Sequence, residues 1–271
     1  MKIFDTVTFF QENHIMDLRF NILNEYIDKF IVCEGIEDHQ GNKKEINFNI
    51  NNFKKFKNKI VHIVCEPFPK HINAWERQAI QREEILNGIE NITKENDLIL
   101  YSDPDEIPDP KILKKIKETS LNEKYIIFLQ KLYFYKFNLQ TNDLLCNWEG
   151  TKGCLKKNLK SIDFMRHKVK KKNINYNIFR FDKEKSIQVI DNAGWHFSYL
   201  LTPEQIQRKI KTFAHTEFNH DQFYNLKNIN DSVKNGVDLF GRNMKFKKVN
   251  LDNSYPEYIL NNQDKYKQWI V

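Results

Sequence analysis

The chain has 271 residues, which is enough for one large domain or two small ones. Its composition, 40% hydrophobic and 13% aromatic, supports a real hydrophobic core and excludes wholesale disorder. The formal net charge of +7 is compatible with solvated surface lysines, and the sequence, with only 8 glycines, contains no glycine-rich phosphate-binding motif.

The first half of the chain alternates strand-like and helix-like patterns. Short apolar runs are typical of buried strands, and apolar residues at helical spacing are typical of helices. These patterns predict strands over residues 3–10, 30–33, 60–65 and 98–101, and helices over residues 15–26 and 73–88. Asn73 and Glu76 have the spacing of a capping box. This order of elements predicts a mainly parallel, helix-covered sheet.

The second half is less regular. The patterns predict one or two strands over residues 125–137, a hairpin formed by residues 176–181 and 186–190, and a strand over residues 195–200. Thr202, Pro203 and Gln205 predict the start of a helix that runs to about Ala214. The tail after Arg242 is polar, and we expect four aromatic residues to pack it against the body: Tyr255, Tyr258, Tyr266 and Trp269.

An acidic turn follows the strand predicted over residues 98–101. It contains Asp103, Asp105 and Glu106. Carboxylate oxygens suit Mg²⁺ or Mn²⁺, and such a metal often binds a diphosphate. The carboxyl end of a buried strand is also where open α/β sheets bind ligands. The alternative is an ordinary turn, in which Asp105 or Asp109 caps the next helix.

Three further groups could carry chemistry. Arg77 and Gln81 share a helix face and could clamp a phosphate, although a solvated face is an equal alternative. His196 alternates with Trp195, so it could face a metal site if Trp195 packs inward; a packed core histidine is the alternative. The segment around His215 follows a helix and could form a cationic lid, or simply a polar turn.

The cysteines and the N-terminus bear on location. The sequence has four cysteines, Cys33, Cys65, Cys146 and Cys154, and no two of them form a C-x-x-C pair. Because Cys33 and Cys65 lie in apolar runs, we expect free thiols. The alternative is that Cys146 and Cys154 pair. The N-terminus lacks a signal-peptide pattern, and no segment approaches eighteen apolar residues. These features predict a cytoplasmic protein, peripheral to a membrane at most.

The lysine-rich run at residues 168–172 is the densest basic patch. It could contact nucleic acid, anionic lipid headgroups or an acidic substrate. Nucleic acid is the least favoured of these because no aromatic residues interleave with the lysines. We therefore expect no nucleic-acid partner and a possible peripheral contact with an anionic membrane.

Taken in order, these pieces resemble glycosyltransferase family 17, the β-1,4-mannosyl-glycoprotein 4-β-N-acetylglucosaminyltransferase family. The resemblance covers roughly residues 1 to 220. It is carried by Phe4-Asp5, Phe9-Phe10, Leu18-Arg19, Ile31-Val32-Cys33-Glu34, Trp75-Glu76-Arg77, Gln81-Arg82, the turn from Ser102 to Pro108, the run from Gly194 to Tyr199, and the run from Phe213 to Glu217.

The resemblance implies a GT-A-like α/β domain over residues 1–245, with a nucleotide-sugar-binding half (1–120), a more irregular acceptor half (121–245) and a C-terminal tail (246–271). It also implies a UDP-sugar donor, with UDP-N-acetylglucosamine (UDP-GlcNAc) as the expectation, a glycan acceptor, Mn²⁺ or Mg²⁺, and inversion at the anomeric carbon. The expected metal ligands are Asp103, Asp105 and His196, with His215 as the runner-up. The expected sugar-donor-binding residues are Glu34, Arg77, Gln81, Arg82, Asp103 and Lys211.

An inverting transfer needs a carboxylate that accepts the proton of the acceptor hydroxyl. The sequence leaves three candidates open, Glu149, Asp191 and Glu217, with a slight preference for Glu217. Two other functions stay open as well: a metal-dependent nucleotide or phosphoester hydrolase, and a non-catalytic module that binds glycans or nucleic acid.

Overall fold

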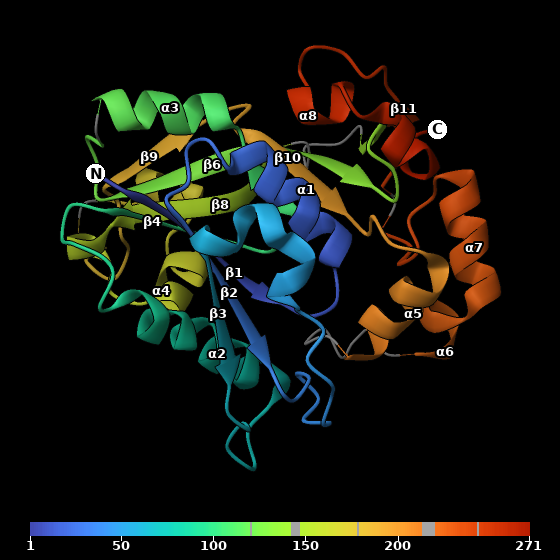
Figure 1. The fold of residues 1–271 in the computed structure, drawn as a ribbon, viewed down its shortest axis with the longest axis horizontal. Helices are drawn as coiled ribbons and strands as arrows, with labels where there is room; N and C mark the ends of the chain where they lie inside the picture. Colours follow the sequence, from blue (N-terminus) through green and yellow to red (C-terminus); the bar gives the residue numbers. More distant parts are fainter. Residues whose placement is uncertain (120, 142–146, 178, 213–219, 243) are drawn as a thin grey trace.

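The computed structural model describes residues 1–119, 121–141, 147–177, 179–212, 220–242 and 244–271. Its centre is a large sheet with helices on both faces (Figure 1). The first half of the sheet is parallel, as predicted, and the structure gives it the strand order β3-β2-β1-β4. These strands are β1 (Ile3–Phe9), β2 (Lys29–Gly35), β3 (Ile60–Cys65) and β4 (Leu98–Ser102).

The second half of the sheet is mixed. β8 runs antiparallel to β4, β6 runs antiparallel to β8, and both β9 and β10 run parallel to β6. β5 pairs with β10, and β11 pairs with β7 at the far edge. Their bounds are β5 (Glu106–Pro108), β6 (Tyr125–Phe134), β7 (Leu139–Thr141), β8 (Trp148–Leu155), β9 (Ile187–Ile190), β10 (Gly194–Ser198) and β11 (Phe246–Lys248).

Helices cover both faces of the sheet. One core cluster lies between the sheet and the side of α1, α3 and α8, and a second lies on the side of α2 and α4. A third cluster joins α5 and α7 to the far end of β6. The bounds are α1 (Asn13–Leu23), α2 (Ala74–Ile89), α3 (Pro110–Thr119), α4 (Ile162–His167), α5 (Pro203–Thr212), α6 (Asp221–Tyr224), α7 (Leu226–Asn235) and α8 (Glu257–Leu260).

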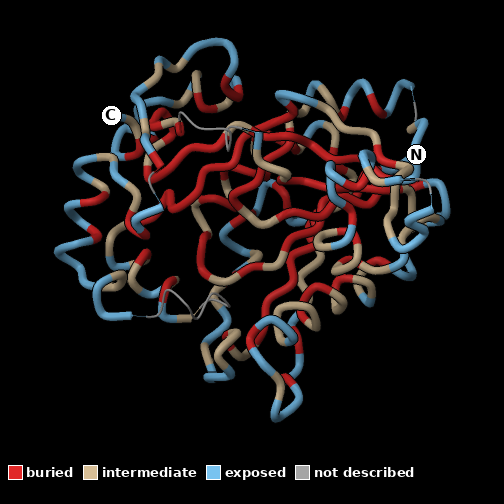
Figure 2. The backbone as a smooth tube through the Cα atoms, turned by 180° about the vertical axis from the view of Figure 1, so that it is seen from behind, coloured by how far each residue is buried: buried red, intermediate tan, exposed pale blue. Residues whose placement is uncertain are grey.

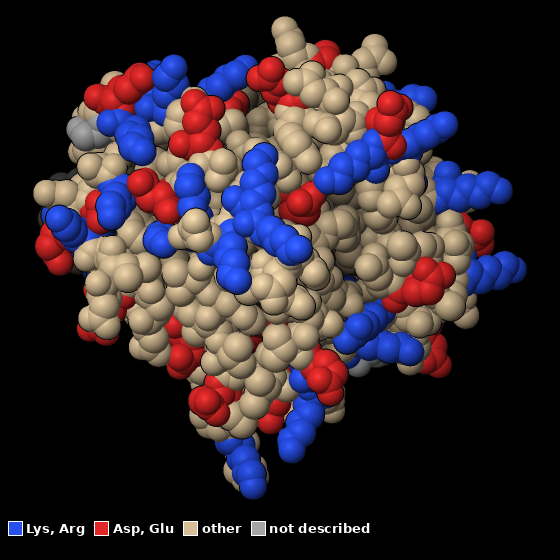
Figure 3. Space-filling model, in the orientation of Figure 1, with Lys and Arg blue, Asp and Glu red and all other residues tan. Residues whose placement is uncertain are grey.

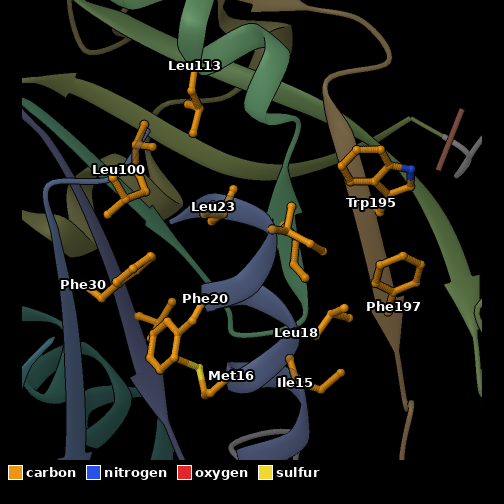
Figure 4. Close-up of a cluster of buried hydrophobic side chains, with 14 of the residues drawn as sticks. Ile15, Met16, Leu18, Phe20, Leu23, Phe30, Leu100, Leu113, Trp195 and Phe197 are labelled. Carbon is orange, nitrogen blue, oxygen red and sulfur yellow. The ribbon is translucent and has the colours of Figure 1, made fainter. Parts of the chain in front are cut away.

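The first core cluster is dense in aromatic and branched side chains. Figure 4 shows Leu18 and Phe20 of α1 between Phe30 of β2 and Phe197 of β10. The buried segments of the backbone follow the strands (Figure 2). Because both faces of the sheet are covered there, β1, β2 and β4 are buried along nearly their whole length, and their apolar residues made them recognisable in the sequence.

Local signals fixed the starts of two helices. The Asn73 side chain accepts hydrogen bonds from the backbone of Trp75 and Glu76, and the Glu76 carboxylate accepts one from the backbone of Asn73 at 2.7 Å. The same reciprocal pair forms between Thr202 and Gln205 at the start of α5. Both predicted helix starts are therefore confirmed, and Glu76 serves the cap rather than a ligand.

The predicted hairpin is wrong. Residues 186–190 do contain β9, but β9 pairs in parallel with β6 rather than with residues 176–181. In that earlier segment Phe179 and Phe181 are 73% and 89% exposed, and Arg180 pairs locally with Asp182. The backbone of β9 instead completes the edge of β6, a non-local pairing that no short-range pattern announces.

The C-terminal tail contributes to the core. Tyr255, Tyr266 and Trp269 are buried in the first core cluster, whereas Tyr258 is only partly buried against it. In the part of the chain that the structure describes, no helix is long and apolar enough to cross a membrane.

Candidate active site

A cavity of about 260 Å³ opens at the carboxyl ends of β1, β2 and β4. Its walls come from the loops after these strands, from the end of β10, and from α2 and α5. Parallel strands bring their carboxyl ends to one edge, so residues far apart in the sequence meet there. Asp103 and Asp105 of the acidic turn line this cavity, whereas Glu106 is fully buried behind it.

Asp105 and His196 lie next to each other in the wall of the cavity. His196 Nε2 lies 3.6 Å from Asp105 Oδ1, and both side chains are about nine-tenths buried. The antiparallel pairing of β5 with β10 places His196 opposite Glu106, directly beside the turn. Trp195 is 5% exposed and packs in the core. The alternation of the two residues therefore works as predicted, with Trp195 inward and His196 in the cavity.

Lys209 of α5 supplies a cation that sequence reasoning missed. Its Nζ lies 3.0 Å from Glu12 Oε1 and 3.7 Å from Asp105 Oδ2. Burial raises the pKa of Asp105, but the charges of Lys209 and His196 outweigh it and hold that pKa well below its ordinary value. The sequence contained a signal for this position. Lys209 stands three residues after the buried Ile206, and this spacing places the two residues on neighbouring parts of one helix face.

Asp103 and Glu106 are held by Arg166 of α4. Arg166 Nη2 lies 2.7 Å from Asp103 Oδ2, and Arg166 Nη1 lies 2.8 Å from Glu106 Oε2. Trp148 Nε1 also donates to Glu106 at 2.6 Å. Burial raises the pKa of Asp103, but the charges of Arg166 and Arg82 hold it below its ordinary value. The positive charges of the arginines thus offset the negative charge of the turn. The buried Glu106 connects the turn to Arg166 and Trp148.

Arg19 holds the same turn from the interior of the protein. This fully buried side chain forms two hydrogen bonds with Asp5, at 2.7 and 2.5 Å. It also donates to Ser102 Oγ at 2.7 Å and to the Glu106 carbonyl at 2.8 Å. A planar guanidinium with several fixed donors can hold backbone and carboxylate groups at once. The geometry of the turn therefore depends on α1 and β1 as well as β4.

The residues present fit part of a divalent-metal site. Among the described residues, no three His, Cys, Asp or Glu side chains converge on one point. Asp105 and His196 nevertheless present one oxygen and one nitrogen side by side, and His196 Nδ1 is buried without a hydrogen-bond partner. Mg²⁺ and Mn²⁺ are commonly held by one or two protein ligands, with phosphate and water oxygens as the rest. His215 lies outside the described residues.

The predicted sugar-donor-binding residues separate into two groups. Gln81 and Asp103 line the cavity, and Gln81 Oε1 accepts a hydrogen bond at 2.8 Å from Nε2 of His39, in the loop after β2. Arg82 lies behind the cavity, where it donates to Tyr101 and Asp163 at 3.0 Å each.

Three other predicted residues do not line the cavity. Glu34 is fully buried and accepts hydrogen bonds from the backbone of Asn47 and Phe48, so it holds the loop after β2. Arg77 contacts the same loop through the His39 carbonyl at 3.4 Å. Lys211 lies over the Tyr224 ring and is exposed.

Two of the three candidate bases, Glu149 and Asp191, do not line the cavity. Glu149 pairs with Lys152 at 3.5 Å and accepts the backbone N–H of Lys171, and it is absent from the cavity wall. Asp191 is exposed in the turn between β9 and β10 and does not line the cavity either. Glu217 lies outside the described residues, in the segment that follows α5.

Comparisons with known proteins identify the family of the chain. The family model for glycosyltransferase family 17 matches residues 1–270. The β-1,4-mannosyl-glycoprotein 4-β-N-acetylglucosaminyltransferases of Rattus norvegicus and Homo sapiens are each 21% identical to the chain over 98% of its length. The chain spans 54% of each of them, about half the length of the curated relatives it matches.

Similar solved structures include residues 1–349 of S. aureus TarS, with a TM-score of 0.43 and 14% identity over 84% of this chain and 69% of that one. The same protein in complex with UDP-GlcNAc gives a TM-score of 0.39 and 12% identity over 87% of this chain and 72% of that one. Because the family model covers all but the last residue, the chain belongs to glycosyltransferase family 17.

Proposed function

We propose that the chain is a metal-dependent, inverting glycosyltransferase that moves N-acetylglucosamine from UDP-GlcNAc to a hydroxyl group of a glycan acceptor. The observation that supports this most directly is the meeting of Asp105, His196 and Lys209 in one cavity at the strand ends. The names of the curated relatives support the choice of sugar and of a glycan acceptor.

The proposed roles follow from charge. Asp105 and His196 would hold the cation, and a bound Mn²⁺ or Mg²⁺ would supply positive charge to the departing diphosphate. Lys209 adds a second positive charge at the same place, since its ammonium already lies 3.7 Å from Asp105. Arg166 keeps Asp103 ionised and oriented. Such fixed charges stabilise a leaving group without reorganising during the reaction.

The proton of the acceptor hydroxyl needs a carboxylate with a free oxygen. Glu12, one of the described carboxylates on the cavity wall, is engaged by Lys209 at 3.0 Å. Asp38 is engaged by backbone N–H groups of its own loop at 2.9 Å, and Glu37 accepts the backbone N–H of Phe68 at 3.1 Å. We therefore retain Glu217 as the proposed base, since it follows the cavity-lining helix α5 by five residues.

Thermal denaturation with ligands tests the proposal. UDP-GlcNAc and Mn²⁺ together should raise the melting temperature of the chain, and Asp105→Asn should abolish that rise, because ligands that bind only the folded state stabilise it. Asp264→Asn, at an exposed position in the tail, is the matched control and should keep the full rise.

A screen of UDP-, GDP- and CDP-sugars with Mn²⁺ then tests the chemistry. We expect slow release of UDP from UDP-GlcNAc in the absence of an acceptor. Equal release of phosphate from simple nucleotides would instead identify a phosphoester hydrolase. If no nucleotide sugar shifts the melting temperature and none is hydrolysed, the transferase proposal is wrong.

A further inference from the structure

A second functional surface lies away from the cavity, in the segment of residues 168–185, here called the basic–aromatic segment. It contains seven Lys or Arg residues and two Asp or Glu residues. A net charge of +5 therefore falls within eighteen residues, out of +7 for the whole chain. A second basic stretch is formed by residues 46–65, which contain four lysines and no Asp or Glu. Acidic and basic side chains both appear on the face in Figure 3, with a group of basic ones near its centre. The basic–aromatic segment has the larger net charge of the two stretches, +5 against +4.

The same segment exposes large apolar side chains. Phe179 is 73% exposed, Phe181 is 89% exposed and Ile174 is 45% exposed. The two phenylalanines are the most exposed large hydrophobic residues in the described part of the chain. Single exposed apolar residues are common on protein surfaces, but a group of them framed by cations indicates an interaction site. Most of the described residues of this segment are exposed.

The lysine run is held in place by the body. Val169 is fully buried, and its carbonyl accepts a hydrogen bond from Lys152 Nζ at 2.5 Å. Asn173 is also buried and donates to the Lys168 carbonyl at 2.7 Å. Between these two anchors the side chains of Lys170, Lys171 and Lys172 are exposed. The segment thus combines exposed lysines, held between two buried residues, with exposed apolar side chains later in the same segment.

We propose that the basic–aromatic segment docks the protein on an anionic lipid surface. Phe179, Phe181 and Ile174 enter the boundary between headgroups and acyl chains, and the flanking lysines contact the anionic headgroups. One apolar group alone gives weak membrane binding, so the combination with a basic cluster is what makes it stable. A bilayer surface is the partner that offers both negative charge and an apolar layer over a wide area.

This surface is connected to the cavity. The segment begins directly after α4, and Arg166 of that helix holds Asp103 and Glu106. Docking through this segment would therefore place the cavity at a fixed distance from the lipid surface. The proposal itself does not depend on the proposed transferase activity, because lipid binding is measured without any sugar donor.

Vesicle sedimentation of the full chain tests the docking. We expect binding to vesicles of phosphatidylcholine and phosphatidylglycerol in equal parts, little binding to pure phosphatidylcholine, and weaker binding at high salt. Replacing Lys170, Lys171 and Lys172 together by Ser should weaken binding by roughly a hundredfold, at about 1 kcal/mol for each lysine. The matched control replaces Lys111, Lys114 and Lys115 of α3, also exposed, by Ser and should bind as the wild type does.

A second pair of variants separates lipid docking from binding of a free polyanion. Phe179→Ser with Phe181→Ser keeps every charge and should weaken vesicle binding by about tenfold or more. Ile92→Ser with Val237→Ser removes two exposed apolar residues elsewhere and should have no effect. Because all these positions are exposed, melting temperatures should stay within a few degrees of the wild type.

Three results would overturn the proposal. One is equal binding to vesicles with and without phosphatidylglycerol. Another is wild-type vesicle binding by the phenylalanine variant, which would show that charge alone suffices, as for a soluble polyanion. The third is an RNA oligonucleotide that binds more tightly than the anionic vesicles and depends on the same phenylalanines, which would assign the surface to nucleic acid.

Discussion

At the scale of single residues, the candidate site is a set of opposed charges that hold one another in position. Asp105 lies beside Lys209 and His196, and Asp103 forms an ion pair with Arg166. A buried charge that loses its partner is expensive, so each member of such a set constrains the others. The charges therefore decide both how rigid the turn is and which ligands it can accept.

Lys209→Met is expected to change nucleotide and metal binding in opposite directions. Loss of the ammonium should weaken UDP binding by about tenfold, the worth of one charge-assisted hydrogen bond. It should also strengthen Mn²⁺ binding in the absence of nucleotide, because Asp105 no longer shares its charge with a lysine. Titration calorimetry measures both. Lys211→Met, two residues along the same helix, is the control. A stronger effect of Lys211→Met than of Lys209→Met would contradict this assignment.

His167 should make the stability of the protein sensitive to mild acid. Burial and the charge of Arg82 lower its pKa from 6.5 to about 4, and its Nε2 accepts a hydrogen bond from Arg82 at 2.6 Å. Between pH 6.5 and pH 4 the unfolded chain therefore binds a proton that the folded chain does not. Stability from this residue is complete above pH 6.5 and falls as the pH drops toward 4.

The size of this effect is limited by exposure, because the His167 side chain is 41% exposed. We expect the free energy of unfolding to fall by about 1 kcal/mol between pH 7 and pH 4.5, after allowance for solvent screening. His167→Gln should remove that part of the pH dependence. Urea denaturation of the two proteins at both pH values is the measurement, and identical pH profiles would count against the assignment.

At the scale of elements, the close approach of β5 and β10 brings His196 to the acidic turn. Gly194, at the start of β10, has φ of +145°, and a Cβ atom there would lie 2.2 Å from the Ile107 carbonyl oxygen. Only glycine permits both that backbone conformation and that contact. The glycine of the run that resembles the family is therefore explained by the packing of two strands rather than by chemistry.

Gly194→Ala is expected to destabilise the fold by more than about 3 kcal/mol, since β5 and β10 must separate and the backbone is strained as well. Gly241→Ala is the matched control. Gly241 also has a positive φ, +66°, but nothing lies within 4 Å of the Cβ position. It should cost only about 1 kcal/mol, the strain of a left-handed backbone. Urea denaturation separates the two, and equal losses would show that φ alone matters.

At the scale of the whole molecule, the C-terminal tail closes the core. The backbone N–H of Phe137 donates to the Trp269 carbonyl at 2.8 Å, and the Trp269 ring stacks on His14 at 5.5 Å between centroids. The tail thus connects the end of the chain to α1 and to the segment after β6. Both termini of the sequence contribute to one hydrophobic core.

Trp269→Ala should lower the free energy of unfolding by about 3 kcal/mol, as expected for a large aromatic side chain removed from a core. Trp75→Ala provides the comparison, because Trp75 is 43% exposed on α2 whereas Trp269 is 8% exposed. We expect its effect to stay below about 1 kcal/mol. Thermal melts of both variants are sufficient, and similar losses would mean that the tail adds little to the core.

The sequence alone determined the elements that are local. Period and capping residues predicted the four parallel strands and the starts of α2 and α5, because these depend on neighbours within a few positions. It also placed Asp103 and Asp105 at a strand end, and His196 on the side of its strand opposite Trp195. The resemblance to the family depended on the same short runs.

Only the tertiary structure decided which charges meet. β8 has the sequence Trp-Glu-Gly-Thr-Lys-Gly-Cys-Leu, which lacks a strand pattern, and it is a strand because β4 and β6 pair with it on both sides. Lys209 and Arg166 reach the acidic turn from helices α5 and α4, although Lys209 is 104 residues after Asp105 and Arg166 is 63 residues after Asp103. Contacts of that kind arise from chain topology and burial, which a local pattern does not encode.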